Sequence, residues 1–308
     1  MRIQILDYQV GPHTFRMVKP SDFNIFKALP SLIPFITTID TTQKVIFETE
    51  IDDDETATKR TIAKTPDDIC FNWEDADCII RPLPHSSHLV SITPRKSGKN
   101  YWMECNDNFR QCFIHLPACR TETPAPENET NFVLNNFLMM LYAFNAARHH
   151  TLLMHASVVA IETGKGYLFL GKSGTGKSTH TGLWLQQFSD CHLLNDDNPI
   201  VHVDSLGKQA TVFGSPWSGK TPCYRKESMT VGAFVRLEQA PQNEIEQERA
   251  AHAFATLLPS CSCLKQNKEI YNAIVTTVTE LATLAPVYHL KCLPDREATE
   301  LCRKTVEG

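Results

Sequence analysis

The chain lacks any long hydrophobic run. No stretch of its 308 residues approaches the ~18 consecutive apolar residues of a membrane helix. The N-terminal stretch, residues 1–15, has no apolar core of signal-peptide length, and Asp7 interrupts it early. We therefore expect a protein that does not associate with a membrane.

An excess of positive charge is also missing. The formal net charge is -5 and the isoelectric point is ≈ 6.2, so no global basic field attracts nucleic acid or anionic lipid. Hydrophobic residues make up 42% of the chain and charged residues 21%, which is typical of a globular protein that buries a sizeable core. We expect no nucleic-acid partner.

Paired cysteine motifs are absent, although cysteine itself is abundant. The 11 cysteines are scattered, and their number is odd. Cys261 and Cys263 form the only close pair, and that spacing is not typical of a zinc site. Reduced, mostly buried thiols are the expected state, and we expect a cytoplasmic protein.

The length of the chain and the change in its sequence pattern along the chain indicate two domains. Residues 1–117 carry short β-branched and aromatic runs separated by turn residues, which predicts a β-rich domain of unassigned role. A linker rich in Pro, Thr and Glu follows over residues 118–130. Apolar residues at helical spacing then predict a helix over residues 131–148, which we assign to a second domain over residues 131–308.

That second domain alternates between strands and helices, which predicts an α/β fold. We expect strands at residues 152–161, 166–171, 191–197, 200–203, 210–214, 231–240 and 286–293, with the fourth and fifth of these paired, and helices at residues 178–188, 243–258 and 268–284. No internal repeat is visible.

A phosphate-binding loop stands at the centre of this domain. Residues 171–178 read GKSGTGKS and fit GxxxxGK[ST] in every position, between a predicted strand and a predicted helix. Such a loop presents backbone N–H groups to phosphate oxygens, its Lys reaches the β- and γ-phosphates, and its Ser ligates Mg²⁺. The predicted nucleotide-binding residues are Gly171, Lys172, Ser173, Gly174, Thr175, Gly176, Lys177, Ser178 and Thr179.

Two carboxylates, Asp196 and Asp197, follow the next hydrophobic strand. The carboxyl end of a parallel strand opens beside the phosphate loop. One carboxylate is then placed to hold Mg²⁺ and the other to take the proton of an acceptor hydroxyl during phosphoryl transfer. His155 lies on a strand predicted to run beside the strand of the loop. A lone His there is more often a core residue, so its candidacy depends on its neighbours.

Together these motifs resemble the catalytic domain of the HPr kinase/phosphorylase family, whose fold is shared with phosphoenolpyruvate carboxykinases. His155 precedes Lys177 by 22 residues, and Asp196 and Asp197 follow that lysine by 19 and 20 residues. The likeness covers roughly residues 150–295. It implies a P-loop α/β domain in which His155, Lys177 and Asp197 are active-site residues, Asp197 is the proton acceptor, and Ser178 is a metal ligand. We assign Asp196 as the second metal ligand.

The sequence departs from that family in one segment. Where the family carries a metal-binding Glu, this chain reads VFGSPWSGK over residues 212–220, without an acidic residue. This departure weakens the case for HPr as substrate and for a reverse phosphorylase step. The segment predicts either a second site, for an anion or an acceptor, or a turn around a buried Trp217. The candidate residues are Ser215, Ser218, Gly219, Lys220 and Arg225.

The leading hypothesis is therefore a kinase that uses ATP, with GTP as an alternative, and Mg²⁺ to phosphorylate a protein serine or a small hydroxyl compound. A nucleotide-binding regulatory or accessory protein without catalysis is the second hypothesis. Plain ATP hydrolysis and a phosphoenolpyruvate carboxykinase-like enzyme are further alternatives. The hexamers of HPr kinases imply a homo-oligomer by resemblance. The sequence does not identify the acceptor.

Overall fold

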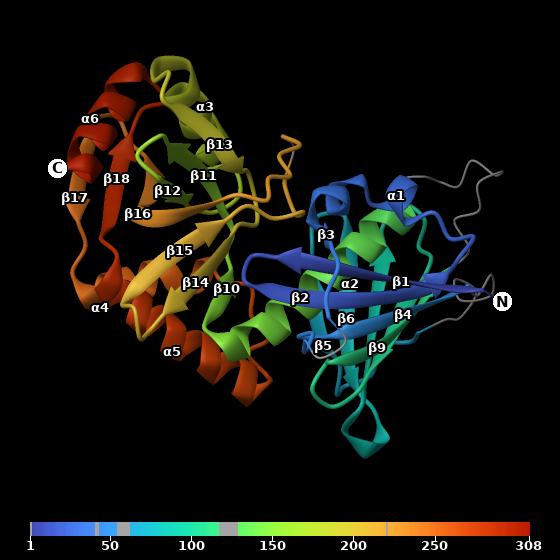
Figure 1. Cartoon of the computed structure of the whole chain (residues 1–308). Helices are drawn as coiled ribbons and strands as arrows, with labels where there is room; N and C mark the ends of the chain where they lie inside the picture. The colour runs from blue at the N-terminus through green and yellow to red at the C-terminus, as the bar shows by residue number, and fades with distance from the viewer. Residues whose placement is uncertain (1, 41–42, 54–61, 117–128, 220) are drawn as a thin grey trace. The chain divides into compact units, whose positions relative to one another are not determined.

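The structure is a computed structural model that describes residues 2–40, 43–53, 62–116, 129–219 and 221–308 (Figure 1). The chain divides into two compact units. The first holds the residues up to Gln9 together with His13–Asn145, and the second holds Val10–Pro12 together with Ala146–Gly308. Each unit contains a large mixed β-sheet, so the fold is mixed α/β. The expected linker lies, up to residue 128, outside the described residues.

Nine strands form the sheet of the first unit, in the order β3-β1-β2-β4-β9-β8-β7-β6-β5. The β2–β4 and β4–β9 pairs are parallel. The strands are β1 (Ile3–Val10), β2 (His13–Pro20), β3 (Ile36–Thr37), β4 (Glu48–Asp53), β5 (Ile69–Asn72), β6 (Ala76–Pro82), β7 (His88–Pro94), β8 (Tyr101–Cys105) and β9 (Gln111–Leu116). The helices are α1 (Ile25–Ala28), α2 (Glu129–Ala146) and the 3-10 helices η1 (Pro30–Phe35) and η3 (Pro84–Ser86).

Helix α2 packs against this first sheet. The Tyr101 hydroxyl on β8 donates a hydrogen bond to Glu129 Oε2 at 2.8 Å, and Phe144 meets the ring of Phe109 edge-on with centroids 5.2 Å apart. The sequence predicted the helix itself but assigned it to the second domain, whereas its residues up to Asn145 belong to the first unit. Tyr101 and Phe109, which contact the helix, precede it in the chain and belong to the first unit, so the boundary follows the helix.

The second unit contains a sheet in the order β10-β14-β15-β16-β12-β11-β13, with β18 paired to β16 and β17 paired to β18. Its strands are β10 (Thr151–Leu153), β11 (Ala156–Ile161), β12 (Lys165–Leu170), β13 (Cys191–Asn195), β14 (Ile200–Asp204), β15 (Gln209–Phe213), β16 (Ser228–Gln239), β17 (Glu244–Gln247) and β18 (Val287–Cys292). Its helices are α3 (Lys177–Gln187), α4 (Ala250–Leu257), α5 (Lys268–Leu284), α6 (Arg296–Glu307) and the 3-10 helices η4 (Ala147–His149) and η5 (Leu258–Ser260). The expected β14–β15 pair is present and antiparallel.

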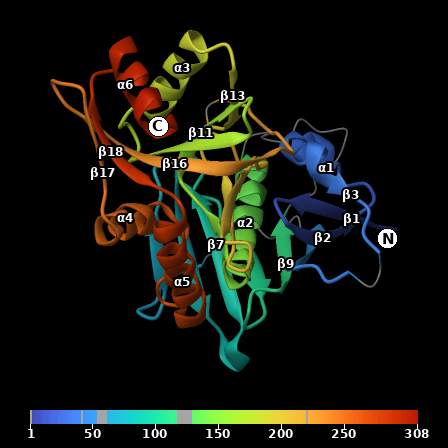
Figure 2. The ribbon, with the colours of Figure 1, turned by 60° about the vertical axis from the view of Figure 1, so that its left-hand side comes forward.

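Helices cover both faces of this sheet. Helices α3 and α6 lie on one face, and α4 and α5 lie on the other (Figures 1 and 2). Trp184 of α3 and Cys302 of α6 are fully buried in one cluster with Tyr167 and Phe169 of β12. Five of the six residues of β12 are buried, as expected for a central strand with both faces covered. This core fixes the strand that carries the phosphate loop.

Two sequence predictions in this unit are wrong in detail. The single strand expected at residues 152–161 is two strands, because the backbone changes neighbours at Met154 and His155: Met154 N donates to Pro199 O, and His155 N donates to Ser260 O. The helix expected at residues 243–258 begins as strand β17, whose residues pair antiparallel with β18. Helix α4 starts only at Ala250.

Within the described part of the chain, no helix is both long and apolar enough to cross a bilayer. The ten cysteines that the structure describes are all free thiols. Burial raises the pKa of several of them, including Cys261 and Cys302, both in the second unit.

Candidate functional site

The candidate residues meet at one edge of the second sheet because of the directions of three strands. Strand β11 is antiparallel to both β12 and β13. The amino end of β11 therefore lies beside the carboxyl ends of β12 and β13. His155 precedes β11, the phosphate loop follows β12, and the carboxylate pair follows β13. The prediction that the His155 strand runs beside the strand of the loop is confirmed for β11.

The phosphate loop connects β12 directly to α3. The loop begins at Gly171, after the last residue of β12, and Lys177 is the first residue of α3. Gly176 caps the helix with φ 102°, a left-handed conformation that glycine adopts without a side-chain clash. Ser178 and Thr179 in the first turn are exposed. This arrangement directs the free N–H groups of the helix toward the loop, where an anion is favoured.

A chain of polar contacts joins Lys177, His155 and Asp197. Lys177 Nζ lies 2.8 Å from His155 Nε2, and His155 Nδ1 lies 3.0 Å from Asp197 Oδ1. Because an ammonium group only donates hydrogen bonds, Nε2 accepts here, and the proton of a neutral imidazole is on Nδ1, facing the carboxylate. His155 therefore bridges the lysine and the carboxylate that the sequence selected.

Backbone carbonyl groups of the loop hold the side chain of Lys177. Its ammonium also donates to the carbonyl oxygens of Gly171, at 2.9 Å, and Lys172, at 3.4 Å. Burial lowers the pKa of Lys177, and the negative charges of Asp197 and Asp196 oppose that shift. A partly desolvated cation at the amino end of a helix favours the approach of an anion.

The two adjacent carboxylates have different surroundings. Asp196 is 7% exposed, and its Oδ1 accepts a hydrogen bond from Ser157 Oγ at 2.8 Å. Its Oδ2 has no partner within the described part of the chain. The Asp197 side chain is 32% exposed, and its Oδ2 accepts from Asn198 Nδ2 at 2.7 Å. The structure thus gives one buried carboxylate with an open oxygen and one carboxylate that faces His155.

Three residues that hold this carboxylate pair in place were not predicted from the sequence. Asn195 Oδ1 accepts the backbone N–H groups of Asp197 and Asn198, each at 2.9 Å. Ser157 links Asp196 to Thr181 of α3, whose Oγ1 is 3.1 Å from Ser157 Oγ. The short polar side chains beside the motif, in HASVV and LLNDDN, were the available signal, because Ser and Asn often bond to neighbouring backbone groups.

The second loop lies against the carboxylate pair. A Cβ placed on Gly219 would be 2.9 Å from Asp196 O and 3.2 Å from Asp197 Cβ. Ser218 Oγ donates to Thr221 O at 2.7 Å. Ser215 is fully buried, and its hydroxyl donates to Asn198 O at 2.6 Å, so it holds the loop rather than facing a ligand. Trp217 is buried beside it, at 2% exposure.

The structure does not bring every candidate of this second loop to the carboxylates. Arg225 pairs with Glu227 at 3.2 Å, and Glu227 in turn contacts His192 near the amino end of β13 at 3.0 Å. Lys220 lies outside the described residues. Among the residues that the structure describes, those of this site included, no group of three or more His, Cys, Asp and Glu side chains gathers as a metal site.

Comparison with protein-family models and with curated proteins finds no match for this chain.

Proposed function

We propose that the chain is an ATP- and Mg²⁺-dependent kinase with an HPr-kinase-like P-loop domain, acting on the hydroxyl of a protein serine or of a small molecule. The single observation that carries the proposal is the contact chain from Lys177 through His155 to Asp197 beside the glycine loop. Nucleotide binding alone needs only the loop. A partly exposed carboxylate joined through His155 to the phosphate-neutralising lysine is what transfer to a hydroxyl requires.

In the proposed reaction, an acceptor hydroxyl approaches the γ-phosphate of ATP from the Asp197 side. A bond forms between the acceptor oxygen and the γ-phosphorus, the bond from that phosphorus to the β–γ bridging oxygen breaks, and ADP leaves. The acceptor proton passes to Asp197. Lys177 neutralises charge on the transferred phosphoryl group. His155 holds both side chains in register, through contacts of 2.8 Å to the lysine and 3.0 Å to the carboxylate.

The residues present fit a Mg²⁺ ion. Asp196 offers an oxygen without a partner among the described residues, and Ser178 follows Lys177 in the exposed first turn of α3. Magnesium in phosphoryl-transfer sites is commonly held by one or two protein ligands together with phosphate oxygens of the substrate. Bound there, the ion would neutralise charge on the phosphates. Ser178 and Asp196 are its proposed ligands.

The test is transfer of label from γ-labelled ATP with Mg²⁺ to purified HPr, free serine or the proteins of a cell extract. The Asp197→Asn variant is expected to lose at least 100-fold in transfer while ATP affinity stays within about threefold, because the amide cannot take the proton. Asp67→Asn, an exposed carboxylate in the first unit, is the matched control and should transfer normally.

Two outcomes would count against this function. Tight ATP binding with no labelled acceptor, unchanged in Asp197→Asn, would indicate a nucleotide-binding regulatory or accessory protein. Free phosphate released without any labelled acceptor would indicate plain hydrolysis. Retained transfer in the variant would remove Asp197 from the role of base.

A further inference from the structure

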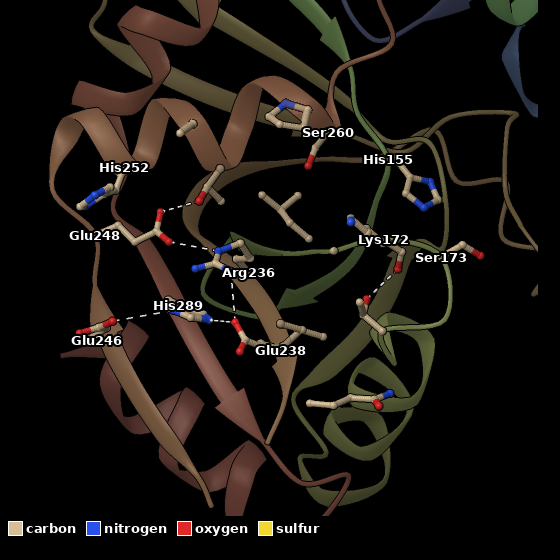
Figure 3. A pocket seen from close by; sticks show the side chains of 18 of the residues that line it. His155, Lys172, Ser173, Arg236, Glu238, Glu246, Glu248, His252, Ser260 and His289 are labelled. Carbon is tan, nitrogen blue, oxygen red and sulfur yellow. Dashed lines mark hydrogen bonds and ion pairs between the residues drawn. The ribbon is translucent and has the colours of Figure 1, made fainter. Parts of the chain in front are cut away.

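A large cleft runs along the phosphate loop (Figure 3). Its volume is ≈ 1180 Å³, above the roughly 300–1,000 Å³ of most small-molecule sites. Residues Gly171–Thr175, the first part of the loop, form one wall. The facing walls come from β16, β17, β18, α4 and η5, and His155 also lines the cleft. Lys177, Asp196 and Asp197 are not among the lining residues.

The position of this cleft follows from strand order. Strand β16 is parallel to β12, and β18 is parallel to β16, so their carboxyl ends lie at the same edge of the sheet as the phosphate loop. They lie on the opposite side of β12 from β11 and β13. Gln239 at the end of β16 donates from Nε2 to Gly174 O at 3.3 Å, which joins this wall directly to the loop.

A triphosphate lying along the loop therefore has two distinguishable ends. The γ-phosphate belongs beside Lys177 and Asp197, where transfer is proposed. The other end, which carries the nucleoside, then lies in the part of the cleft that β16 and β18 form. This assignment rests on the proposed function, because it takes Asp197 to mark the γ-phosphate.

The wall of the cleft is a fixed polar network. Glu238 Oε2 is 2.8 Å from His289 Nε2 and 3.5 Å from Arg236 Nη1. Arg236 also donates from Nε to Glu248 Oε1 at 3.2 Å, and Thr256 of α4 donates to Glu248 Oε2 at 2.7 Å. Figure 3 shows these side chains linked across the wall. They hold Glu238 in place at the end of β16.

One oxygen of that carboxylate remains free. Glu238 Oε1 has no partner among the residues that the structure describes, and the Glu238 side chain is 50% exposed. A carboxylate with a free oxygen is the group that accepts hydrogen bonds from ribose hydroxyls in many nucleotide sites. No Phe, Tyr or Trp lines the cleft within the described part of the chain, so the sugar, rather than stacking of the base, offers the directional contact.

We infer that the cleft binds the nucleoside of the phosphate donor and that Glu238 accepts a hydrogen bond from a ribose hydroxyl. Glu238 is a binding residue in this assignment. Arg236 and His289 are positioning residues that orient it.

The experiment is calorimetric titration of the full chain, with Mg²⁺ present, with three probes: ATP, 2′,3′-dideoxy-ATP and tripolyphosphate. In the wild-type protein, ATP should bind about tenfold tighter than dideoxy-ATP, because a hydrogen bond to a charged group is lost. Tripolyphosphate should bind more weakly than either nucleotide. Glu238→Ala should weaken ATP about tenfold and change dideoxy-ATP and tripolyphosphate less than twofold.

The controls separate the site from general effects. Glu297→Gln, at an exposed position on α6, removes a carboxylate that does not line the cleft. It should change none of the three affinities. Glu238→Gln keeps an acceptor oxygen and should recover part of the affinity for ATP. The comparison of ATP with dideoxy-ATP needs no variant, so it stands even if a substitution impairs folding.

Failure of this inference and failure of the proposed function give different results. Equal binding of ATP and dideoxy-ATP would overturn the role of Glu238. Equal binding of ATP and tripolyphosphate would overturn the nucleoside assignment and would indicate that the cleft binds the phosphate acceptor instead. Hydroxyl-dependent ATP binding without phosphate transfer would support the inference while the kinase proposal fails. If neither ATP nor tripolyphosphate binds, both proposals fail.

Discussion

Asp196 and Asp197 show how two identical neighbouring residues acquire different chemistry. Asp196 points into the unit, where Ser157 donates to it, and Asp197 points to His155. Both residues lie in the bend that follows β13, where Asn195 Oδ1 accepts the backbone N–H groups of Asp197 and Asn198, and this bend gives the two side chains different neighbours. In the proposed reaction only Asp197, the more exposed of the two, meets the acceptor.

Gly219 gives the first residue-scale prediction. An alanine Cβ there would be 2.9 Å from Asp196 O, closer than such atoms approach, so the backbone of the carboxylate pair must shift. Displacing a reacting group by about 1 Å can lower a rate as much as 100-fold. We expect Gly219→Ala to reduce phosphate transfer about tenfold with ATP affinity within twofold, as measured by steady-state kinetics and calorimetry.

Gly182→Ala is the matched control for that substitution. A Cβ on Gly182 meets nothing within 4 Å, and Gly182 lies inside α3, where alanine is favoured over glycine by up to ~1 kcal/mol. This variant should transfer phosphate normally and unfold at a slightly higher temperature. Normal transfer by Gly219→Ala would show that the second loop does not hold the carboxylates in place.

At the scale of an element, helix α3 carries a buried histidine directly behind the phosphate loop. His180 is 3% exposed, and its Nε2 accepts from Trp184 Nε1 at 3.1 Å. Burial lowers the pKa of His180 to about 4. The ring is therefore neutral in the folded protein at pH values where it is protonated in the unfolded chain.

This difference predicts acid sensitivity. With an unfolded pKa of ~6.5, the stabilising contribution is fully present above that pH and is lost as the pH falls toward the folded value. Between about pH 7 and pH 5, His180 alone should cost about 2 kcal/mol of unfolding free energy. His180→Gln keeps an acceptor for Trp184 but does not titrate, so urea unfolding should show a smaller acid loss by about that amount.

The exposed His252 on α4 provides the comparison for this prediction. His252→Gln should lose as much stability between the two pH values as the wild-type protein. An acid loss in His180→Gln equal to that of the wild-type protein would show that the buried ring is not the source.

Individual strands show how far the sequence predicts the fold. Strand β12 was found because its apolar run is continuous. The break at Met154 and His155 was not, because VVAI and LLM are equally apolar and only the long-range partners Pro199 and Ser260 separate them. Strand β17 reads EIEQ, a helix-favouring composition that pairing with β18 overrides.

Some residues of the candidate site could also be predicted from the sequence, and others could not. The phosphate loop and the carboxylate pair each lie within a few consecutive residues, so spacing alone identifies them. The contact between His155 and Lys177 depends on β11 lying beside β12, which the sequence predicted without fixing the distance. The cleft wall is assembled from several elements distant in sequence, and Arg236, Glu238 and His289 carry no local motif. Only tertiary structure brings such residues together.

At the scale of the whole molecule, the boundary between the two units follows α2. Five apolar side chains on this helix are completely buried: Val133, Leu134, Phe137, Leu138 and Leu141. Burying one such side chain contributes about 1.5–3 kcal/mol. The residues that contact the helix, including Tyr101 and Phe109, belong to the first unit. A fragment that keeps the helix but omits those residues would expose this apolar stripe to water.

Two fragments test this boundary. We expect residues 131–308, the domain that the sequence predicts, to self-associate through the exposed stripe of α2, because a large contiguous apolar patch on a free surface promotes association. Residues 146–308 omit that stripe and keep η4, whose Arg148 pairs with Glu269 of α5 at 2.7 Å, so this fragment should elute as a single species and unfold cooperatively. Size-exclusion chromatography with light scattering compares the two at equal concentration. The full chain serves as the control for correct folding. A monodisperse 131–308 fragment together with an aggregating 146–308 fragment would contradict the boundary and return α2 to the second unit.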